Sequence, residues 1–302
     1  MIIIKVKGGL GNQMWQYAFY RSLKEEKKDV YLDLSWFDKG GNRPLDLWRA
    51  FDLPVKSKST ISDKSYMKLM NQPCLMRLVN RILHKISHYQ ICKNNYNIQY
   101  FKEKEWIKPG SYYNISEGIL DGYWQNLYYF KNIQQNIHKI FVFKKFNEDK
   151  VNEIERYILN SKGSASLHWR RGDYVGHKRL GLNLEKYFLR ALKHLKQTIN
   201  LEDVFVFTED YDYVHKMLLS YNLDLNYIYV TQELNTTNHY YEPYLMSICD
   251  NNIISNSTFS WWAAYLNKNV NKIVISPAKW LNNSEHNLID HKIPSSWIKM
   301  PI

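Results

Sequence analysis

The sequence lacks a long hydrophobic run: no stretch approaches the roughly 18 consecutive apolar residues needed to span a bilayer. Residues 1–7 have neither the extended apolar region nor the small-residue cleavage site of a signal peptide, and they fit a first strand better. Cysteine is scarce: Cys74, Cys92 and Cys249 follow no zinc or redox spacing. These absences exclude a membrane-spanning helix and a disulfide framework, and they indicate free thiols in a reducing compartment.

Low-complexity sequence is also missing, because no stretch is Gly/Ser-rich, acidic or repetitive. The composition therefore predicts neither a disordered tail nor a solenoid. What the chain does have is 302 residues that are 45% hydrophobic and 15% aromatic, enough for two domains with substantial cores. Its 41 Lys and Arg against 29 Asp and Glu give a net charge of +12. Such a charge suits phosphates, nucleic acid or an anionic membrane surface, and does not distinguish among them.

Short apolar strands alternate with helical patterns from residue 163 onward. The expected strands are 164–169, 204–207, 227–230, 252–254 and 272–275, and the expected helices between them are 184–196, 211–219, 241–248 and 258–266. This alternation is typical of a doubly wound parallel sheet.

The N-terminal residues predict a second βαβ unit. A glycine turn at residues 8–11 leads from the first strand into an amphipathic helix, and a strand at residues 30–34 leaves Asp33 near its carboxyl end. The glycines Gly8 and Gly11 fit either a ligand-facing turn or a tight βα connection, and their spacing completes neither a dinucleotide fingerprint nor a P-loop.

Residues 56–110 hold 11 Lys and Arg against 3 Asp and Glu, so they carry +8 of the net charge. Within them, residues 75–86 predict a basic amphipathic helix that either packs on a core or contacts a membrane surface or an acceptor. The charged stretch 144–150 fits a linker. We therefore expect an N-terminal domain at residues 1–145 and a C-terminal domain at residues 146–302.

The densest cluster of functional side chains is residues 168–174 (HWRRGDY), directly after an apolar run. Open α/β sheets bind ligands at the carboxyl ends of their strands, where this cluster is predicted to lie. Paired arginines can hold a phosphate or carboxylate bidentately; the alternative is an ion-pair network with Asp173. From strand alternation we expect Arg170 to share a face with His168, and Arg171 to point the other way and pair with Asp173.

Polar residues also follow two other predicted strands of the C-terminal domain, Glu209 and Asp210 after one and residues 255–258 after another. The second group opens a helix with Ser257 and Thr258, which fit either an anion site or a simple N-cap. Three such strand ends predict a nucleotide diphosphate site. Although Asp210 and Asp212 resemble a metal-binding Asp-x-Asp, arginines and a helix N-terminus can neutralise a diphosphate without a metal, and we expect none.

Five segments together resemble the α-1,2-fucosyltransferases of glycosyltransferase family 11: residues 8–14 (GGLGNQM), 122–125 (GYWQ), 168–175 (HWRRGDYV), 206–210 (VFTED) and 255–264 (SNSTFSWWAA). The resemblance implies a GT-B fold, in which two Rossmann-like domains face a cleft. It also implies GDP-β-L-fucose as donor, inversion to an α-fucoside, a galactose 2-hydroxyl as acceptor, and no metal or other cofactor.

By the same resemblance, the C-terminal domain binds the donor. His168 would hold the guanine side, Arg170 the β-phosphate, and Glu209 or Asp210 the base. Ser257 and Thr258 would bind the diphosphate. The remaining donor residues implied are Arg171, Asn256 and Phe259 in this domain, and Gly9, Gly11 and Asn12 in the other. For the acceptor we expect Tyr123, Trp124 and Gln125.

For catalysis, Arg170 is expected to stabilise the charge that develops on GDP as it leaves. An inverting transfer also needs a base for the acceptor hydroxyl, and Asp33 is the candidate, although a strand-terminal Asp is more often a cap or turn residue.

Two other classes of function are compatible with parts of the sequence, a nucleic-acid-binding protein and a non-catalytic sugar-binding domain. The first fits the net charge but lacks a base-reading motif, and the second does not need paired arginines beside a Ser/Thr helix start. The sequence thus predicts a cytoplasmic bacterial enzyme without a nucleic-acid partner. Its galactose-containing acceptor is either free or lipid-linked at the inner membrane face, where peripheral contact with the membrane is compatible with the charge.

Overall fold

The structure is a computed structural model, and it describes residues 1–38, 40–54, 90–91, 99–103, 112–282 and 291–302. The predicted basic helix at residues 75–86, with His84 and His88, lies outside these ranges. The chain divides into two compact units, Met1–Val142 and Phe143–Ile302. The boundary expected from the sequence, between residues 145 and 146, lies close to this division.

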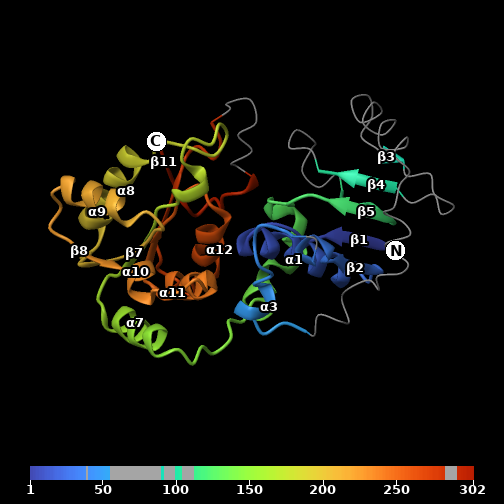
Figure 1. Cartoon of the computed structure of the whole chain (residues 1–302), viewed down its shortest axis with the longest axis horizontal. Coiled ribbons are helices and arrows are strands. Elements are labelled where there is room, and N and C mark those ends of the chain that lie inside the picture. Colours follow the sequence, from blue (N-terminus) through green and yellow to red (C-terminus); the bar gives the residue numbers. More distant parts are fainter. Residues whose placement is uncertain (39, 55–89, 92–98, 104–111, 283–290) are drawn as a thin grey trace. The chain divides into compact units, whose positions relative to one another are not determined.

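Unit 1 is built on a five-stranded sheet in the order β2-β1-β5-β4-β3, in which only β3 runs antiparallel to its neighbour (Figure 1). Its strands are β1 (Ile2–Lys5), β2 (Val30–Asp33), β3 (Gln90–Ile91), β4 (Gln99–Lys102) and β5 (Gly118–Asp121). The helices among its described residues are α1 (Leu10–Glu25), α2 (Ser35–Asp38), α3 (Leu47–Ala50), the 3-10 segment η2 (Leu127–Asn136) and α6 (Ile137–Ile140).

Helix α1 forms the centre of unit 1 because aromatic side chains cover it on several sides. Trp15 packs on Phe130 with ring centroids 5.4 Å apart, and Phe19 packs on Trp124 at 5.2 Å. Most of α1 is buried, including Gln13 and Gln16. A helix surrounded by protein in this way keeps the glycine turn at its N-terminus in a fixed place.

Unit 2 contains a six-stranded sheet, parallel throughout, in the order β8-β7-β6-β9-β10-β11. The strands are β6 (Ala165–His168), β7 (Asp203–Phe207), β8 (Asn226–Tyr229), β9 (Asn251–Ile253), β10 (Val274–Pro277) and β11 (Ile298–Met300). Numbered along the unit this order is 3-2-1-4-5-6, as in dinucleotide-binding sheets, and it reverses between β6 and β9. That point of reversal is where such sheets bind their ligands.

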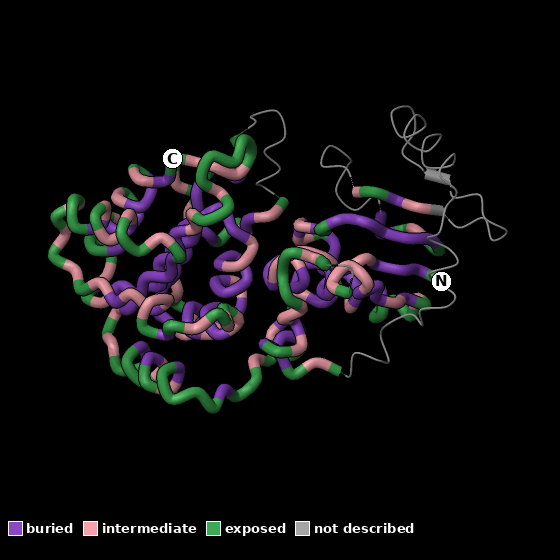
Figure 2. Tube along the Cα trace, in the orientation of Figure 1, coloured by how far each residue is buried: buried purple, intermediate pink, exposed green. Residues whose placement is uncertain are grey.

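Helices cover both faces of this sheet, and each face has its own core (Figures 1 and 2). The helical elements of the unit are α7 (Asp149–Asn160), η3 (Gly172–Tyr174), α8 (Glu185–Thr198), α9 (Tyr211–Ser220), α10 (Val230–Leu234), η4 (His239–Tyr241), α11 (Glu242–Ile248) and α12 (Thr258–Leu266). Leu167 and Trp169 pack toward α8 and α9, whereas Phe205 and Phe207 pack toward α7 and α11.

The α/β class and the parallel sheets predicted from the sequence are confirmed, and each predicted strand and helix of unit 2 is present within a few residues of its expected bounds. The structure adds α10 and the edge strand β11, which the sequence reading missed. Strand β6 ends at His168, so Trp169 and the two arginines belong to the following loop rather than to the strand.

Candidate functional site

His168 ends β6 at the point where the strand order reverses. Its imidazole is 3% exposed, and Nδ1 lies 2.9 Å from Oγ of Ser260 and 3.2 Å from Oγ of Ser255. The ring of Phe259 lies 5.7 Å away, centroid to centroid. Burial, with a smaller contribution from the Arg170 charge, lowers the pKa of His168 to about 3. His168 is therefore a neutral imidazole at physiological pH, which can form hydrogen bonds but carries no charge.

Arg170 and Arg171 have different partners from those expected. Arg170 Nη2 lies 2.6 Å from Oδ1 of Asp173, and Nη1 lies 3.2 Å from Oε1 of Glu209. Arg171 Nε donates to Oδ2 of Asp210 at 2.6 Å. The prediction that Arg171 pairs with Asp173 is wrong, because strand alternation stops at His168 and the chain turns at Gly172, which brings Asp173 back under Arg170.

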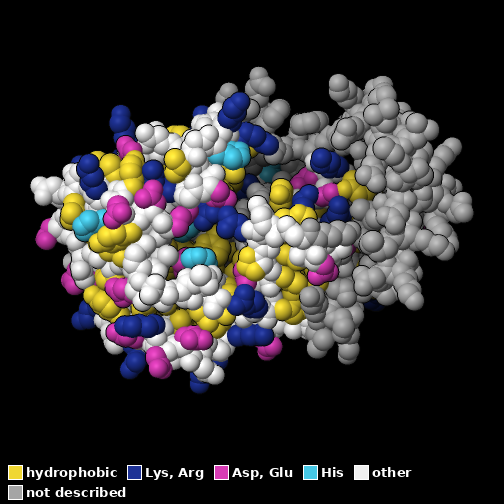
Figure 3. Space-filling view, viewed as in Figure 1, with side chains coloured by type: hydrophobic (Ala, Val, Ile, Leu, Met, Phe, Trp, Pro, Cys, Tyr) yellow, Lys and Arg dark blue, Asp and Glu magenta, His cyan; other side chains and the backbone are white. Residues whose placement is uncertain are grey.

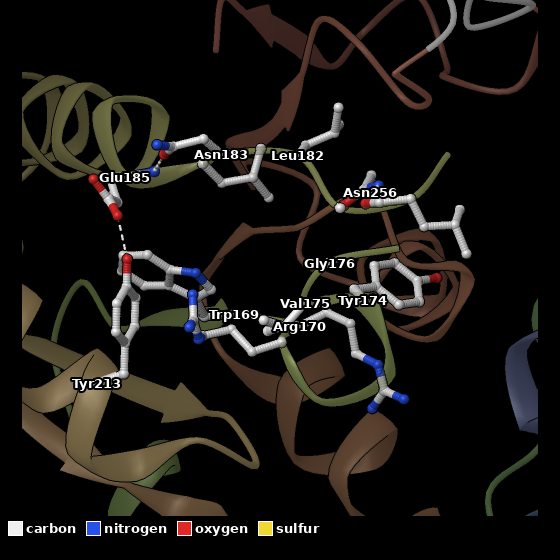
Figure 4. Close-up of a pocket in the computed structure, with 14 residues that line it drawn as sticks. Trp169, Arg170, Tyr174, Val175, Gly176, Leu182, Asn183, Glu185, Tyr213 and Asn256 are labelled. Carbon is white, nitrogen blue, oxygen red and sulfur yellow. Dashed lines mark hydrogen bonds between the residues drawn. The ribbon is translucent and has the colours of Figure 1, made fainter. Parts of the chain in front are cut away.

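The two guanidiniums also lie against different aromatic rings. Arg171 Cζ sits 3.3 Å from the ring centroid of Tyr213 on α9, and Arg170 Cζ sits 5.5 Å from that of Tyr174. Figure 4 shows Arg170 extending away from Tyr213 and Glu185. The arginine pair therefore serves two environments: Arg170 faces the acidic side chains after β6 and β7, and Arg171 is held against α9.

The turn between β9 and α12 supplies the second wall. Ser257 caps α12 by accepting a hydrogen bond from the Phe259 amide at 3.3 Å, as the N-cap interpretation predicts. Asn256 is 2% exposed, and its Nδ2 donates to the carbonyls of Leu180 at 2.9 Å and Trp280 at 3.0 Å. Thr258 and Phe259 are partly exposed in the first turn of α12. Asn256 thus fixes the loop after β6, while the start of α12 offers amide and hydroxyl groups.

A cavity of about 250 Å³ opens beside these elements (Figure 4). It is lined by Trp169, both arginines and Asn256, and by residues 174–176 and 180–184 of the loop after β6. Glu185 and Tyr213, which hydrogen-bond to each other, complete the lining. The cavity combines aromatic faces with charged and amide groups, a composition that suits a sugar or a nucleotide.

Charge is mixed rather than concentrated on unit 2. On the face shown in Figure 3, basic and acidic side chains alternate over this unit. Among the described residues, no group of three or more His, Cys, Asp or Glu is placed to hold a metal ion. In the same part of the chain, no helix combines the length and the apolarity that crossing a membrane requires.

In unit 1 the glycine turn is held by amide side chains. Gln13 donates from Nε2 to the carbonyls of Gly8 at 2.9 Å and Pro44 at 2.8 Å. Gln125 donates to Oδ1 of Asn12 at 2.7 Å, which joins an expected acceptor residue to an expected donor residue. Gly9 is the N-cap of α1, and Gly11 is buried in its first turn. These contacts fix the turn before any ligand arrives.

The GYWQ segment divides between surface and core. Tyr123 is 42% exposed, with Lys7 Nζ 5.2 Å from its ring centroid. Trp124 is 0% exposed and packs between Phe19, Tyr112 and Tyr129. Its backbone has a left-handed φ of +55°. The expectation that Trp124 binds the acceptor is therefore wrong, because the whole side chain belongs to the core.

Asp121, just before this segment, joins the charges at the end of β5. Its carboxylate pairs with Lys5 at 3.2 Å, and with Lys7 and the Tyr100 hydroxyl. Burial alone would raise the pKa of Asp121, but the two ammonium groups and the hydrogen bonds outweigh it and lower the pKa to about 2. A carboxylate this acidic is a counterion, not a base for an alcohol.

Asp33 lies at the end of β2, as predicted. It is 4% exposed, and its Oδ1 accepts a hydrogen bond from the Ser35 amide at 2.9 Å. This contact is that of a turn residue. The role of Asp33 as a base stays a prediction.

The sequence reading missed three groups of residues. His239 on η4 and Glu242, the first residue of α11, form a hydrogen-bonded pair, and Glu185 meets Tyr213 in the cavity. The Asp121 cluster is the third. Each group joins residues from different segments of the chain, except the His239 pair, whose i, i+3 spacing at a helix start was a usable signal.

Comparison with known proteins connects this geometry to a family. The model of glycosyl transferase family 11 matches residues 1–300. The chain belongs to glycosyl transferase family 11. The predicted family is thereby confirmed, and with it the glycosyltransferase class of activity. Two Rossmann-like α/β units in one chain are the components of the predicted GT-B type.

Two curated relatives and one solved structure illustrate the similarity. An alpha-1,2-colitosyltransferase from Escherichia coli is 30% identical over 310 residues, which cover 99% of each chain. The O-antigen biosynthesis glycosyltransferase WbnK, also from Escherichia coli, is 28% identical over 316 residues, covering 98% of this chain and 99% of WbnK. The fucosyltransferase NodZ from Bradyrhizobium is 11% identical, with a TM-score of 0.48, 87% of this chain and 91% of NodZ being covered.

Proposed function

We propose that this family 11 enzyme transfers L-fucose from GDP-β-L-fucose to the 2-hydroxyl of a terminal β-galactoside in a surface glycan, with inversion at the anomeric carbon and without a metal ion. The observation that carries the proposal is the position of the anion-binding groups in the fold. Strands β6 and β9 flank the point where the strand order reverses, and they lead to Arg170 and to the Ser257-capped start of α12. Such a sheet edge suits a nucleotide diphosphate.

The chemistry proposed for Arg170 is electrostatic. When the bond between the anomeric carbon and the phosphate oxygen breaks, GDP leaves with an additional negative charge. A guanidinium at the β-phosphate stabilises that charge more in the transition state than in the bound donor, and this difference accelerates the reaction. His168, being neutral, would hold the nucleotide by a hydrogen bond rather than by charge.

The remaining donor and acceptor residues are assigned by the same proposal. On unit 2 the donor would contact Arg171, Glu209, Asp210, Ser257, Thr258 and Phe259, with Asn256 shaping the loop. On unit 1 we assign Asn12 with Gly9 and Gly11 to the donor, and Tyr123 with Gln125 to the acceptor. Asp33 is proposed as the base. We further propose a cytoplasmic location with peripheral contact at the inner membrane face, where a lipid-linked glycan would be available.

A second donor has a specific observation in its favour, the name of the alpha-1,2-colitosyltransferase relative. Colitose is fucose without its 3-hydroxyl group, so a GDP-colitose enzyme could share the diphosphate site and differ only where the sugar sits. The relative named for O-antigen biosynthesis supports a glycan of that kind as the acceptor. The wider alternative is another sugar nucleotide or another fucosyl linkage.

The test is GDP release from a panel of sugar nucleotides with β-galactoside acceptors, with EDTA present throughout. We expect the fastest turnover with GDP-fucose, and a product cleaved by an α-1,2-specific fucosidase. Faster turnover with GDP-colitose would identify GDP-colitose as the donor instead. A product resistant to the fucosidase would show that the linkage is not α-1,2. Release that stops with EDTA and returns with a divalent ion would overturn the metal-free mechanism.

Arg170→Ala tests the residue assignment in the same assay. Loss of a donor aimed at developing charge costs about 10²- to 10³-fold in kcat, and Arg170→Lys should restore part of it. Arg190→Ala is the matched control, since Arg190 is exposed on α8 and donates to the Pro301 carbonyl. Equal activity of the Arg170→Ala and Arg190→Ala enzymes would remove Arg170 from the mechanism.

A further inference from the structure

Arg171 is held by two side chains at the start of α9. Its Cζ lies 3.3 Å from the ring centroid of Tyr213, well within the range of a cation–π contact. Its Nε donates a hydrogen bond to Oδ2 of Asp210 at 2.6 Å. The arginine side chain is only 21% exposed, so water competes little for either contact. Arg171 therefore joins the face of the Tyr213 ring to one oxygen of Asp210.

Asp210 is the N-cap residue of α9, but its carboxylate makes no capping hydrogen bond. An Asp in this position ordinarily accepts a hydrogen bond from an amide of the first turn, which stabilises the helix. Here Oδ2 is bound to Arg171 instead, and 36% of the side chain stays exposed. The ion pair thus replaces the cap and leaves the carboxylate accessible after the end of β7.

Tyr213 is itself fixed by its neighbours. Its hydroxyl donates a hydrogen bond to Oε1 of Glu185, the first residue of α8 (Figure 4). The indole of Trp169 meets the Tyr213 ring edge-on, with centroids 6.2 Å apart and planes at 88°. Trp169 in turn packs on Phe188 at 4.3 Å in the core of unit 2. The ring that supports Arg171 is therefore anchored both to α8 and to the core.

We propose, on the basis of the donor site proposed above, that Tyr213 is a positioning residue for the donor base, which acts through Arg171 and determines where the Asp210 carboxylate lies. The edge of guanine carries two adjacent donors, N1–H and the 2-amino group, which match the two oxygens of a carboxylate. A carboxylate has about four acceptor positions, so Oδ2 can accept from Arg171 and from the base together.

The orientation of Asp210 is what the stacked pair controls. Held by a planar guanidinium, the carboxylate keeps one orientation and can accept from both guanine donors. Without the ring under Arg171, the carboxylate is free to rotate or to cap α9, and it loses that alignment. The stacking of Tyr213 on Arg171 thereby contributes to the selection of a guanine nucleotide.

The experiment measures the binding of GDP and of inosine diphosphate (IDP), whose base lacks the 2-amino group, to the full chain by titration calorimetry. We expect the wild type to bind GDP about 10-fold more tightly than IDP, as for one hydrogen bond to a charged group. Tyr213→Leu removes the ring face, and the ratio should fall to about 2-fold or less. Partial unfolding would reduce the number of sites for both nucleotides equally and leave this ratio unchanged.

Three single variants make the outcome specific. Tyr213→Phe keeps the ring under Arg171 and loses only the hydroxyl, so it should keep most of the preference for GDP. Arg171→Lys keeps the charge but not the planar group, and should behave as Tyr213→Leu does. Tyr221→Phe is the matched control: the Tyr221 hydroxyl, at the end of α9, donates to the backbone carbonyl of Glu185 at 2.5 Å, and the variant should bind both nucleotides as the wild type does.

A double substitution tests whether Tyr213 acts through Asp210. Asp210→Asn alone should lose the preference for GDP, because an amide offers the base one acceptor and one donor in place of two acceptors. Adding Tyr213→Leu to Asp210→Asn should change the ratio no further. A further loss as large as that in the wild-type background would show that Tyr213 acts by another route, and would overturn the inference.

Failure of this inference is distinguishable from failure of the donor site. If the full chain binds neither nucleotide, or if Arg170→Ala binds GDP as the wild type does, the donor site falls and the role of Tyr213 falls with it. If Arg170→Ala loses GDP binding while Tyr213→Leu keeps the wild-type ratio, the donor site stands and the role of Tyr213 is refuted. Equal affinity of the wild type for GDP and IDP would also refute that role.

Discussion

Glu209 lies so close to Gly172 that no side chain fits between them: a Cβ atom at Gly172 would come within 2.5 Å of Oε1 of Glu209. That same oxygen accepts the Arg171 amide and pairs with Arg170. The glycine therefore determines where the carboxylate sits, and through it the position of the arginine.

Gly172→Ala should displace Glu209 and loosen Arg170. We expect about a 10-fold or greater rise in the KM for the donor, with a loss of stability of only about 1 kcal/mol from the left-handed backbone. Gly40→Ala is the control, because Gly40 also has a positive φ, no atom lies within 4 Å of its Cβ position, and it is not part of the candidate site. Equal kinetic effects from the two substitutions would show that backbone strain, not Glu209, is responsible.

The buried His168 should make stability depend on pH. Its pKa is about 3 in the folded protein, below the usual 6.5, so the unfolded chain binds the proton first as pH falls. This contribution to stability is complete above pH 6.5, and it decreases by about 1.4 kcal/mol per pH unit toward the folded pKa. In denaturant unfolding between pH 6.5 and 4.5, His168→Gln should show a correspondingly flatter dependence. An NMR signal of His168 that titrates near pH 6.5 would contradict this assignment.

Asp121→Asn should destabilise unit 1 by about 1–3 kcal/mol, because it leaves Lys5 and Lys7 without their shared counterion. Since the pKa of Asp121 is about 2, below its usual 3.8, the stabilisation is complete above about pH 4 and disappears as pH falls toward 2. Urea unfolding across this range measures both effects. The exposed Asp52→Asn should change neither, and an Asp121→Asn protein as stable as the wild type would show that the cluster is not stabilising.

Asp33→Asn tests the proposed base. An asparagine still accepts the Ser35 amide, so the turn should persist while kcat falls about 10²-fold or more. Asp38→Asn, on the neighbouring α2, serves as the comparison and should retain activity. If Asp33→Asn keeps full activity with a normal pH profile, Asp33 is a turn residue alone.

The predictions from sequence succeeded where local pattern decides the structure. Apolar runs such as Val204–Phe207 predicted the strands of unit 2, because a strand that is buried on both faces is apolar along most of its length. The same reasoning placed His168 and Ser257 at neighbouring strand ends, since parallel strands bring their carboxyl ends to one edge. The short, partly exposed β11 carries no such signal.

Side-chain partners were less predictable, because they depend on where a strand ends and on contacts between distant segments. The partner of Arg170 could not be read from alternation, since β6 stops two residues earlier. Trp124 is buried against Phe19, a residue far away in the sequence, and a local pattern does not reveal that contact. Pattern reading identifies which residue types gather at an edge; the turn geometry decides which of them meet.

Asn256 joins three segments at the edge of the unit 2 sheet. Because its one amide group binds the carbonyls of both Leu180 and Trp280, the loop after β6, the turn after β9 and the segment after β10 are fastened at a single point. These three segments should therefore exchange their amide hydrogens at a common rate, and opening any one of them requires releasing the other two.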